Sequence, residues 1–381
     1  MNYKAIAITV GIVLLFCGAT TATGLVGREI DNIVQNRSMV GTYLLYDLSG
    51  SYTDNETHDT FGISGLMSQE YLDYDWNRGF QTKMEMAMTM DAGTITRTTA
   101  ETETSWTNDD DGSNHDYKKT GETTLSTDFG SKECEIWEYS EDGESGTEYV
   151  GKDNITYLAE GTFTEDKSTI TVSYTLKSIN DKDKAKLTRS YTWSYKGQQY
   201  SVTLDIGLSD FIKYRTDTIG RSQVTDDGNK HDLSLVTYDD KYVKDLANII
   251  SSRSAGMSNI DKIGMVLAFT QYVEYCYDEV SMGVDEYWKY PVETLVDKNG
   301  DCEDTSILFC AIAKQMGFDT CMIIYPGHMA AGVNLSGLSG YYYTFNAKHY
   351  YYCETTSTGW DIGDNPGPKY QQDKVSRHII V

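Results

Sequence analysis

The chain has 381 residues, 39 % of them apolar, and a formal net charge of −25. That length is enough for two or three domains with their own hydrophobic cores. The excess of acidic side chains argues against nucleic acid as a partner, because few basic groups remain to neutralise phosphates, and against binding to anionic membrane surfaces. We therefore expect an acidic surface in contact with solvent and no nucleic-acid interface.

The N-terminal segment carries no charge from Ala5 to Gly27, and Lys4 precedes it. This stretch is long enough to cross a bilayer once, so we expect residues 1–30 to form a transmembrane anchor, the chain's only contact with the membrane. The apolar part alone also fits a signal peptide with Ala22 as the cleavage residue. An anchor predicts a cell-membrane protein with extracellular C-terminal domains, and a cleaved signal predicts a secreted one. Four glycosylation tripeptides are compatible with a surface glycoprotein: Asn36, Asn55, Asn154 and Asn334.

Residues 40–188 are predicted to form an antiparallel β-rich domain, either a sandwich or a curved half-barrel. Alternating apolar and polar residues are the main signal, with turn residues such as those of 109–112 between the strands. Four methionines at positions 84, 86, 88 and 90 point to one side of a strand. They are interpreted as one buried strand face, and a site for a soft metal or a flexible hydrophobic ligand is the alternative.

Residues 189–239 are predicted to form a hairpin and a linker. The hairpin spans 189–214 and turns at Lys196-Gly197, and the linker contains residues 226–229. A third domain is expected over 240–381. It opens with a helix from about Asp239 to Ser251 and a second helix that begins near Ser258 or Asn259, because apolar residues recur there at helical spacing.

The cysteines follow two patterns. Five of them lie within apolar runs and are predicted to be buried free thiols: Cys134, Cys276, Cys310, Cys321 and Cys353. No group of cysteines and histidines has the spacing of a zinc site, so no structural zinc is expected. Cys302 differs, because it stands where a loop becomes a helix.

The segment from Gly300 to Leu308 predicts a helix that begins at Cys302 and ends at Gly317. Asp301 is a good N-cap residue, and Asp304 can reach back to complete a capping box. In the first helical turn, unpaired backbone N–H groups and the helix dipole stabilise a thiolate. Cys302 is therefore the predicted nucleophile, although a cysteine at a helix start often has no catalytic role.

His328 and Glu354 follow at intervals of about 26 residues, each near a predicted strand. Neighbouring antiparallel strands lie about 4.8 Å apart, so the two side chains can meet against the helix end. The order of nucleophile, base and orienting carboxylate fits a catalytic triad. Asp361 is the reserve candidate for the acid, and the structural alternative for His328 is a turn residue after Pro326-Gly327.

Several motifs in this order resemble the transglutaminase-like superfamily, most closely the microbial transglutaminase-like cysteine peptidases and their archaeal membrane-anchored relatives. The resemblance covers roughly residues 240–365. It differs from the family pattern at Glu354, where Asp is usual. The matching segments are Tyr287-Trp288-Lys289-Tyr290-Pro291-Val292-Glu293-Thr294-Leu295, Gly300-Asp301-Cys302-Glu303-Asp304, Pro326-Gly327-His328, Tyr352-Cys353-Glu354-Thr355-Thr356 and Gly359-Trp360.

The resemblance implies an α+β protein whose C-terminal, papain-like core packs a cysteine-bearing helix on an antiparallel sheet. It also implies a cysteine peptidase that hydrolyses peptide or isopeptide bonds of a protein or peptide substrate, here expected to be a cell-envelope protein. A protein-modifying transglutaminase, or a non-enzymatic binding protein that works through its β domain, are the alternatives. We expect the backbone N–H of Cys302, with a second donor near Trp288, to form an oxyanion hole. No cofactor or metal is expected, although Glu303 and Asp304 suggest calcium as an alternative.

Overall fold

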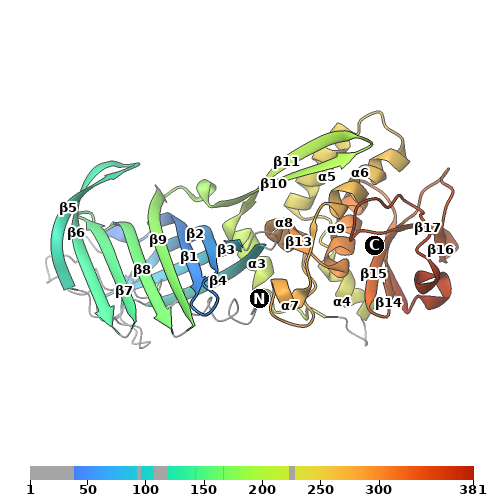
Figure 1. The fold of residues 1–381 in the computed structure, drawn as a ribbon. Helices are drawn as coiled ribbons and strands as arrows, with labels where there is room; N and C mark the ends of the chain where they lie inside the picture. The colour runs from blue at the N-terminus through green and yellow to red at the C-terminus, as the bar shows by residue number, and fades with distance from the viewer. Residues whose placement is uncertain (1–37, 92–95, 107–117, 142, 166, 223–227) are drawn as a thin grey trace. The chain divides into compact units, whose positions relative to one another are not determined.

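The computed structural model describes residues 38–91, 96–106, 118–141, 143–165, 167–222 and 228–381 (Figure 1). The predicted N-terminal segment 1–30, Asn36, the 109–112 turn and residues 226–227 of the linker lie outside these ranges. The chain divides into two compact units. One comprises Met1–Gly93, Arg97–Leu187 and Gly207–Thr216, and the other Thr94–Thr96, Thr188–Ile206 and Asp217–Val381, so far as they are described.

The described residues are mostly β, with 48 % in strands and 24 % in helices. The expected α+β class with an N-terminal membrane helix is therefore wrong. Within the described ranges the longest helix has 14 residues, or about 21 Å, which is short of a bilayer core of about 30 Å. None of these helices is long and apolar enough to cross a membrane. The predicted single-pass anchor and cell-membrane location are thus not supported.

The first unit is built on one nine-stranded sheet, in the order β4-β3-β2-β1-β9-β8-β7-β6-β5. Two runs of consecutive strands meet where β1 pairs with β9 in antiparallel register. The sheet curls, so that the early strands pass behind β7–β9 (Figure 1). The strands are β1 (Tyr43–Asp54), β2 (Thr60–Asp75), β3 (Gly79–Asp91), β4 (Thr96–Trp106), β5 (Lys118–Thr127), β6 (Gly130–Glu141), β7 (Glu144–Gly151), β8 (Thr156–Glu165) and β9 (Ser168–Ile179).

The period-2 patterns of these strands place one apolar face in a common core. In β9, the alternating residues Ile170, Val172, Tyr174 and Leu176 are buried there. All four methionines of β3 belong to the same core. Their interpretation as a buried strand face is therefore confirmed, because each packs among apolar side chains.

The hairpin predicted around Lys196-Gly197 is present as β10 (Lys186–Tyr195) and β11 (Gln198–Gly207). Both turn residues have positive φ, 49° and 77°, as a two-residue hairpin turn requires. The predicted C-terminal end of the hairpin at residue 214 is wrong, because Leu208–Arg215 form helix α3. This helix buries Leu208, Phe211 and Ile212. A 3-10 turn, η2 (Lys182–Lys184), precedes the hairpin.

The second unit contains a five-stranded sheet in the order β16-β17-β15-β14-β18. Helix α9 packs against β14 and β15 and also contacts α5, α6 and α8 (Figure 1). The helices are α4 (Gly228–Leu235), α5 (Lys241–Arg253), α6 (Asn259–Gln271), α7 (Asp278–Ser281), α8 (Pro291–Asp297) and α9 (Cys302–Gln315), with 3-10 turns η3 (Pro368–Tyr370) and η4 (Gln372–Lys374). The strands are β12 (Glu274–Tyr275), β13 (Asn299–Gly300), β14 (Thr320–Tyr325), β15 (His328–Val333), β16 (Tyr342–Phe345), β17 (Lys348–Cys353) and β18 (Arg377–Ile380).

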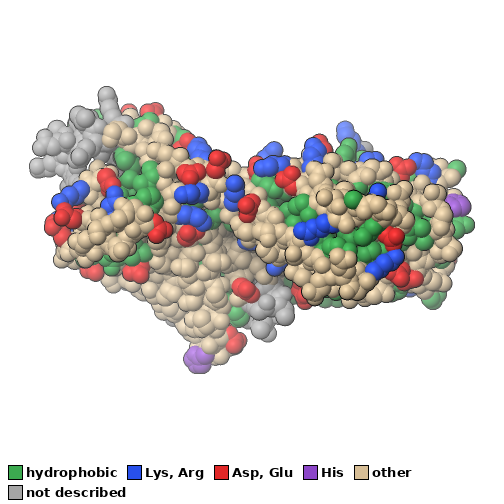
Figure 2. Space-filling model, turned by 90° about the horizontal axis from the view of Figure 1, so that it is seen from above, with side chains coloured by type: hydrophobic (Ala, Val, Ile, Leu, Met, Phe, Trp, Pro, Cys, Tyr) green, Lys and Arg blue, Asp and Glu red, His purple; other side chains and the backbone are tan. Residues whose placement is uncertain are grey.

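The two helices predicted before the cysteine are confirmed as α5 and α6. Their N-caps are polar side chains that accept backbone N–H groups, Asp240 from Tyr242 and Ser258 from Asp261. The five cysteines predicted to be buried free thiols are all buried and unbridged. On the face seen in Figure 2, basic side chains lie interspersed with acidic ones.

Candidate active site

Cys302 is the first residue of α9, as predicted. The Asp301 carboxylate accepts hydrogen bonds from the backbone N–H groups of Glu303, at 3.2 Å, and Asp304, at 3.5 Å, and so caps the helix. The expected capping box is not formed, because the Asp304 carboxylate turns to Lys289. Gly300 has no room for a side chain, since a Cβ there would lie 2.5 Å from the Cβ of Asp304. The chain can therefore pass close to its own helix only with glycine at this position.

His328 begins β15 directly after a tight turn from β14. The turn brings His328 opposite Tyr325, and Gly327 adopts the positive φ of 69° that the turn requires. The imidazole lies against two tyrosine rings, with centroid distances of 6.2 Å to Tyr325 and 4.7 Å to Tyr370. Its side chain is 12 % exposed, so the ring is held by packing while one edge remains accessible.

Glu354 follows β17 and meets His328, as predicted from the strand arrangement. His328 Nε2 lies 3.3 Å from Glu354 Oε2. The same oxygen accepts a 2.6 Å hydrogen bond from the Tyr352 hydroxyl. The other oxygen accepts two bonds from Thr356, at 2.7 Å from the hydroxyl and 3.1 Å from the backbone N–H. Both carboxylate oxygens are thus supplied with donors, which fixes the orientation of Glu354 toward the imidazole.

Polar contacts join the residue after Glu354 to helix α9. The Thr355 hydroxyl lies 2.9 Å from that of Thr305 and 3.2 Å from that of Ser306, both on α9. On the other side, Gln271 Nε2 donates to the carbonyl oxygen of Glu354 at 2.8 Å. Because these contacts are buried, they fix the position of the end of β17 relative to the start of α9.

The electrostatic surroundings of Glu354 favour its ionised form. Burial alone would raise the pKa of this carboxyl group. Hydrogen bonds from His328, Tyr352 and Thr356, together with the charge on His328, outweigh burial and lower the pKa to about 2. Glu354 is therefore a permanent anion that can hold the imidazole in one tautomer and stabilise its cation.

The Cys302 thiol behaves differently from the sequence-based expectation of a stabilised thiolate. Burial raises its pKa well above the usual range, and the neighbouring carboxylates of Glu303 and Asp301 raise it further. The thiol donates to Glu303 Oε2 at 2.9 Å. A hydrogen bond from the backbone N–H of Met329 to the sulfur acts in the opposite direction. In this conformation Cys302 is thus a protonated thiol whose sulfur touches the residue next to His328.

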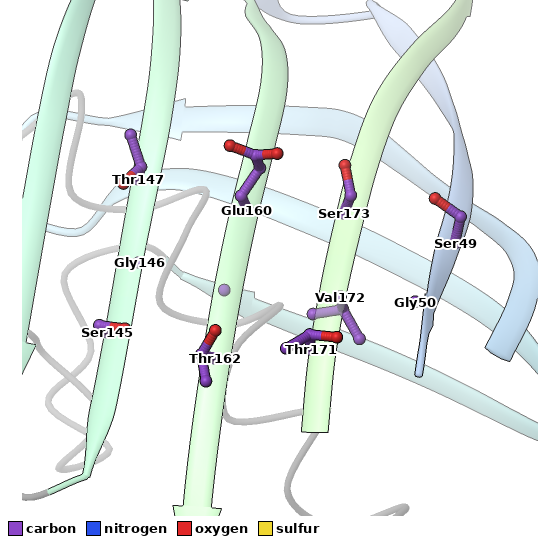
Figure 3. A pocket seen from close by; sticks show the side chains of 11 residues that line it. Ser49, Gly50, Ser145, Gly146, Thr147, Glu160, Thr162, Thr171, Val172 and Ser173 are labelled. Atoms are coloured by element: carbon purple, nitrogen blue, oxygen red, sulfur yellow. The ribbon is translucent and has the colours of Figure 1, made fainter. Parts of the chain in front are cut away.

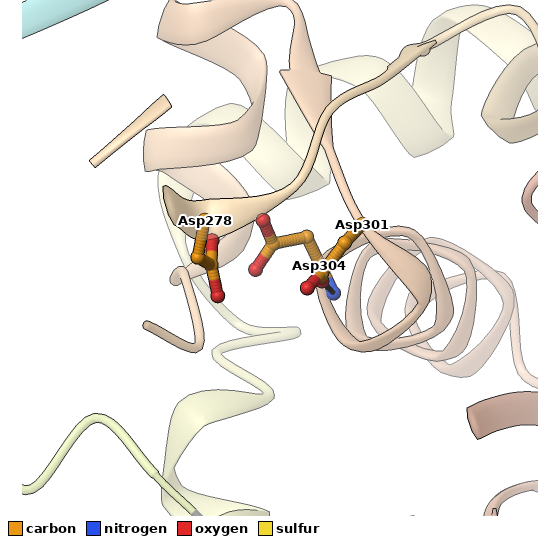
Figure 4. A group of neighbouring side chains, drawn as sticks. All are labelled: Asp278, Asp301 and Asp304. Carbon is orange, nitrogen blue, oxygen red and sulfur yellow. Dashed lines mark hydrogen bonds between the residues drawn. The ribbon is translucent and has the colours of Figure 1, made fainter. Parts of the chain in front are cut away.

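An acidic cluster lies behind the first turn of α9. Carboxylate oxygens of Asp278, Asp301 and Asp304 lie within 4.8 Å of one another (Figure 4). Lys289, fully buried, places its Nζ 2.9 Å from Asp304 Oδ2. The contact is an ion pair between two fully buried groups. The calcium alternative had paired Asp304 with Glu303, whereas the structure groups Asp304 with Asp278 and Asp301.

Two further predicted residues do not take part in the arrangement. Asp361, the reserve acid, is exposed, and the hydrogen bonds described for it are made by its backbone N–H and carbonyl groups with Asp364. Trp288 is buried and its indole N–H donates to Glu286 at 2.6 Å. The expected second oxyanion donor near Trp288 stays a prediction. The sequence predicts no role for Tyr352 or for Lys289. A lysine within the aromatic run before Pro291 was the available signal for the latter.

A polar hollow of about 430 Å³ lies on the sheet of the first unit (Figure 3). Hydroxyl groups of β1, β7, β8 and β9 line it, and Gly50, Gly146 and Gly161 leave the sheet surface open beneath them. Its one charged lining residue is Glu160. This lining offers neither a thiol nor an imidazole.

No family model and no curated protein sequence match this chain. Among solved structures, it is similar to a provisionally assigned cysteine protease of Cytophaga hutchinsonii, with 8 % identity over 89 % of this chain and 83 % of that one and a TM-score of 0.24. It is also similar to a provisionally assigned protease of Parabacteroides distasonis ATCC 8503, with 10 % identity over 79 % and 69 % of the chains and a TM-score of 0.23. The neighbours are protease-like, but such TM-scores do not establish a shared fold.

Proposed function

We propose that this protein is a cysteine-dependent acyl-transfer enzyme that hydrolyses peptide or isopeptide bonds of polypeptides through Cys302, His328 and Glu354. The carrying observation is the 3.3 Å contact between His328 Nε2 and a fully hydrogen-bonded Glu354 carboxylate, beside the helix start that bears Cys302. Burial of an anion is tolerated only when donors supply its oxygens, and the donors around Glu354 hold this anion where it can orient the imidazole.

The proposed reaction begins with a change of partner for the thiol. The hydrogen bond from the S–H group to Glu303 breaks, and the thiol proton passes to His328 Nδ1. The Nε2–H group of His328 stays hydrogen-bonded to Glu354. The thiolate then attacks the carbonyl carbon, a C–S bond forms, and the carbonyl π electrons move to oxygen. When this intermediate collapses, the C–N bond breaks and the amine leaves with the proton from His328. The result is a thioester on Cys302.

Water completes the cycle in the hydrolytic reaction. His328 removes a proton from water, hydroxide adds to the thioester carbon, and the C–S bond breaks to release an acid and restore the thiol. A primary amine in place of water gives transamidation by the same steps. Whether water or a primary amine is the acceptor at this site is therefore decided by measuring which product forms.

The test is an assay of the purified full chain on a mixture of unfolded polypeptides, with and without a labelled primary amine. Peptide cleavage that disappears in Cys302→Ala supports the hydrolase, and incorporation of the amine that disappears in the same variant supports the transferase. Cys321→Ala is the matched control, because Cys321 is buried in the sheet and is expected to leave the reaction unchanged. If neither product forms, or if Cys302→Ala keeps full activity, the proposed function is wrong.

A further inference from the structure

The buried lysine behind Cys302 is unusual in its charge balance. One ammonium group, that of Lys289, faces several carboxyl groups in a region without solvent. Besides its ion pair with Asp304, it is attracted electrostatically by Asp297 and Asp278. Lys289, Asp304, Asp297 and Asp278 are each at most 4 % exposed. A buried charge is tolerated only when it is paired and supplied with hydrogen bonds, so this lysine and these acids depend on each other.

Oxygens of Asp304 and Asn299 lie close to the ammonium, and together with the neighbouring carboxylates of Asp278 and Asp301 they form an incomplete cage. Asp304 uses Oδ1 to accept the backbone N–H of Lys289 at 2.7 Å and presents Oδ2 to Nζ at 2.9 Å. The carbonyl oxygen of Asn299 lies 3.4 Å from the same Nζ. Asp278 accepts the backbone N–H of Tyr287 with Oδ2 at 2.6 Å, while its buried Oδ1 has no hydrogen-bond partner among the described residues.

We propose that the Lys289 ammonium is the built-in cation of the Asp278–Asp301–Asp304 cluster, and that removing it converts the cluster into a site for a divalent cation such as Ca²⁺ or Mg²⁺. Carboxylate and carbonyl oxygens are the ligands these hard cations prefer. The cluster supplies three carboxylates, and one oxygen of Asp278 among them is unsatisfied. Asn299 adds a backbone carbonyl beside them, which makes a cation-binding set. The protein fills it with a covalently tethered charge, so occupancy does not depend on the ion concentration around it.

The cluster also holds the turn that carries the thiol. Asp301 caps α9 through the N–H groups of Glu303 and Asp304, the residues that follow Cys302. Asp304 is fixed in turn by Lys289. Lys289 is therefore a positioning residue for the nucleophile, a role that rests on the proposed function, whereas the cation role stands without it.

The experiment compares the full-length wild type with Lys289→Ala and Lys289→Met in thermal unfolding, first with a chelator and then with CaCl₂ or MgCl₂. Alanine leaves room for an ion and its water, whereas methionine keeps the volume filled and the charge absent. Breaking a buried ion pair should lower the unfolding midpoint of both variants by about 10 °C in chelator. A divalent cation should restore Lys289→Ala, leave Lys289→Met unrestored and leave the wild type unchanged.

Two further variants sharpen this result. Adding Asp278→Asn to Lys289→Ala should abolish the restoration, because a cage carboxylate is lost. Lys348→Ala removes an exposed ion pair with Asp319 and should show neither the large loss nor any restoration. If Lys289→Ala folds only when a divalent cation is present, the proposal is supported in its strongest form.

Two outcomes overturn the proposal. Cation-dependent stabilisation of the wild type would mean that the cluster binds metal beside Lys289. A Lys289→Ala protein that stays unfolded, or stays destabilised, with every divalent cation would mean that Lys289 is a packing residue only. Neither outcome bears on the proposed function, which fails separately if Cys302→Ala retains activity. The rate of Cys302 alkylation in Lys289→Ala, with and without cation, then reports whether the thiol is positioned through this cluster.

Discussion

Two groups of buried carboxyls flank the start of α9, and their environments are opposite. Glu354 receives hydrogen bonds on both oxygens, and its pKa falls to about 2 despite burial. Asp278 lies in the acidic cluster, where burial and the neighbouring Asp304 raise its pKa to about 8 even though Lys289 opposes the shift. Burial is the largest influence in both cases, so it does not decide the outcome. The number of hydrogen-bond donors around each carboxyl group decides whether its pKa falls or rises.

This difference assigns different tasks to the two sides of Cys302. The Glu354 side offers a fixed anion that can stabilise a protonated His328. On the other side, burial raises the pKa of the Cys302 thiol, and the carboxylates of Glu303 and of Asp301, a member of the acidic cluster, raise it further. The carboxylates on one side thus keep the Cys302 thiol protonated, whereas His328 and Glu354 on the other side are the groups proposed to deprotonate it. The following predictions test each side.

The largest effect is expected from the base. His328→Ala removes the group that, in the proposed mechanism, takes the thiol proton and returns it to the leaving amine. Proton transfer by a positioned side chain contributes about 10²- to 10⁴-fold, and we expect a loss of about 10⁴-fold in kcat/KM. The measurement is cleavage or amine incorporation by the purified variant. His349→Ala is the control, since His349 is an exposed residue stacked on Tyr342. Equal losses in the two variants would exclude a specific role for His328.

A smaller loss is expected from the acid and its donor. Glu354→Gln keeps the shape but removes the anion, and we expect kcat/KM to fall about 10²-fold, the lower end for acid–base assistance. Tyr352→Phe leaves the anion but removes its 2.6 Å hydrogen bond, so about a tenfold fall is expected. Tyr351→Phe also removes a hydroxyl group, one bonded to Leu338, and should change little. Activity unchanged in Glu354→Gln would contradict the triad.

The opposite effect, a gain in stability, is expected in the acidic cluster. The folded protein keeps the Asp278 proton up to about pH 8, whereas the unfolded chain releases it near pH 4. Between these values the folded state binds more protons, so the cost of burying Asp278 grows as pH rises through this window and is absent below it. Asp278→Asn removes this titration and should stabilise the protein by on the order of 2 kcal/mol at pH 8 and by nothing at pH 4.

Urea unfolding at several pH values measures this gain. Asp361→Asn, at an exposed position, is the matched control. It should change the free energy of unfolding only slightly, and by the same amount at both pH values. A loss of stability at pH 8 in Asp278→Asn would show that the carboxylate is ionised and needed there, and the contrast with Glu354 would then disappear.

Local signals predicted the backbone of the site. The cap of α9 by Asp301, the turn before His328 and the placement of Glu354 beside it follow from residue types and strand alternation over short distances. The hairpin and helices α5 and α6 were found for the same reason. These features depend on contacts within a few residues or between neighbouring strands, which periodicity encodes.

Long-range contacts account for what was not predicted. The joining of nine strands into one curled sheet depends on the pairing of β1 with β9, more than 100 residues apart. The protonated state of Cys302 arises from burial and from Glu303, and the role of Lys289 arises from its approach to Asp304. No pattern along the chain reports which side chains meet in the interior or how deeply they are buried. The predicted membrane anchor rested on composition alone, and no described helix supports it.

The central claim is that Cys302 and His328 can form a thiolate–imidazolium pair once Glu303 releases the thiol. The direct test is the pH dependence of Cys302 alkylation by iodoacetamide, followed at that residue by mass spectrometry in the wild type, Glu303→Gln and Glu303→Gln/His328→Ala. The account predicts that Cys302 of the wild type reacts only at high pH. In Glu303→Gln, Cys302 should react at pH values well below ~8.5, the pKa of a free thiol. The double variant should lose this reactivity at lower pH. The same profile for Glu303→Gln with and without His328 would contradict it.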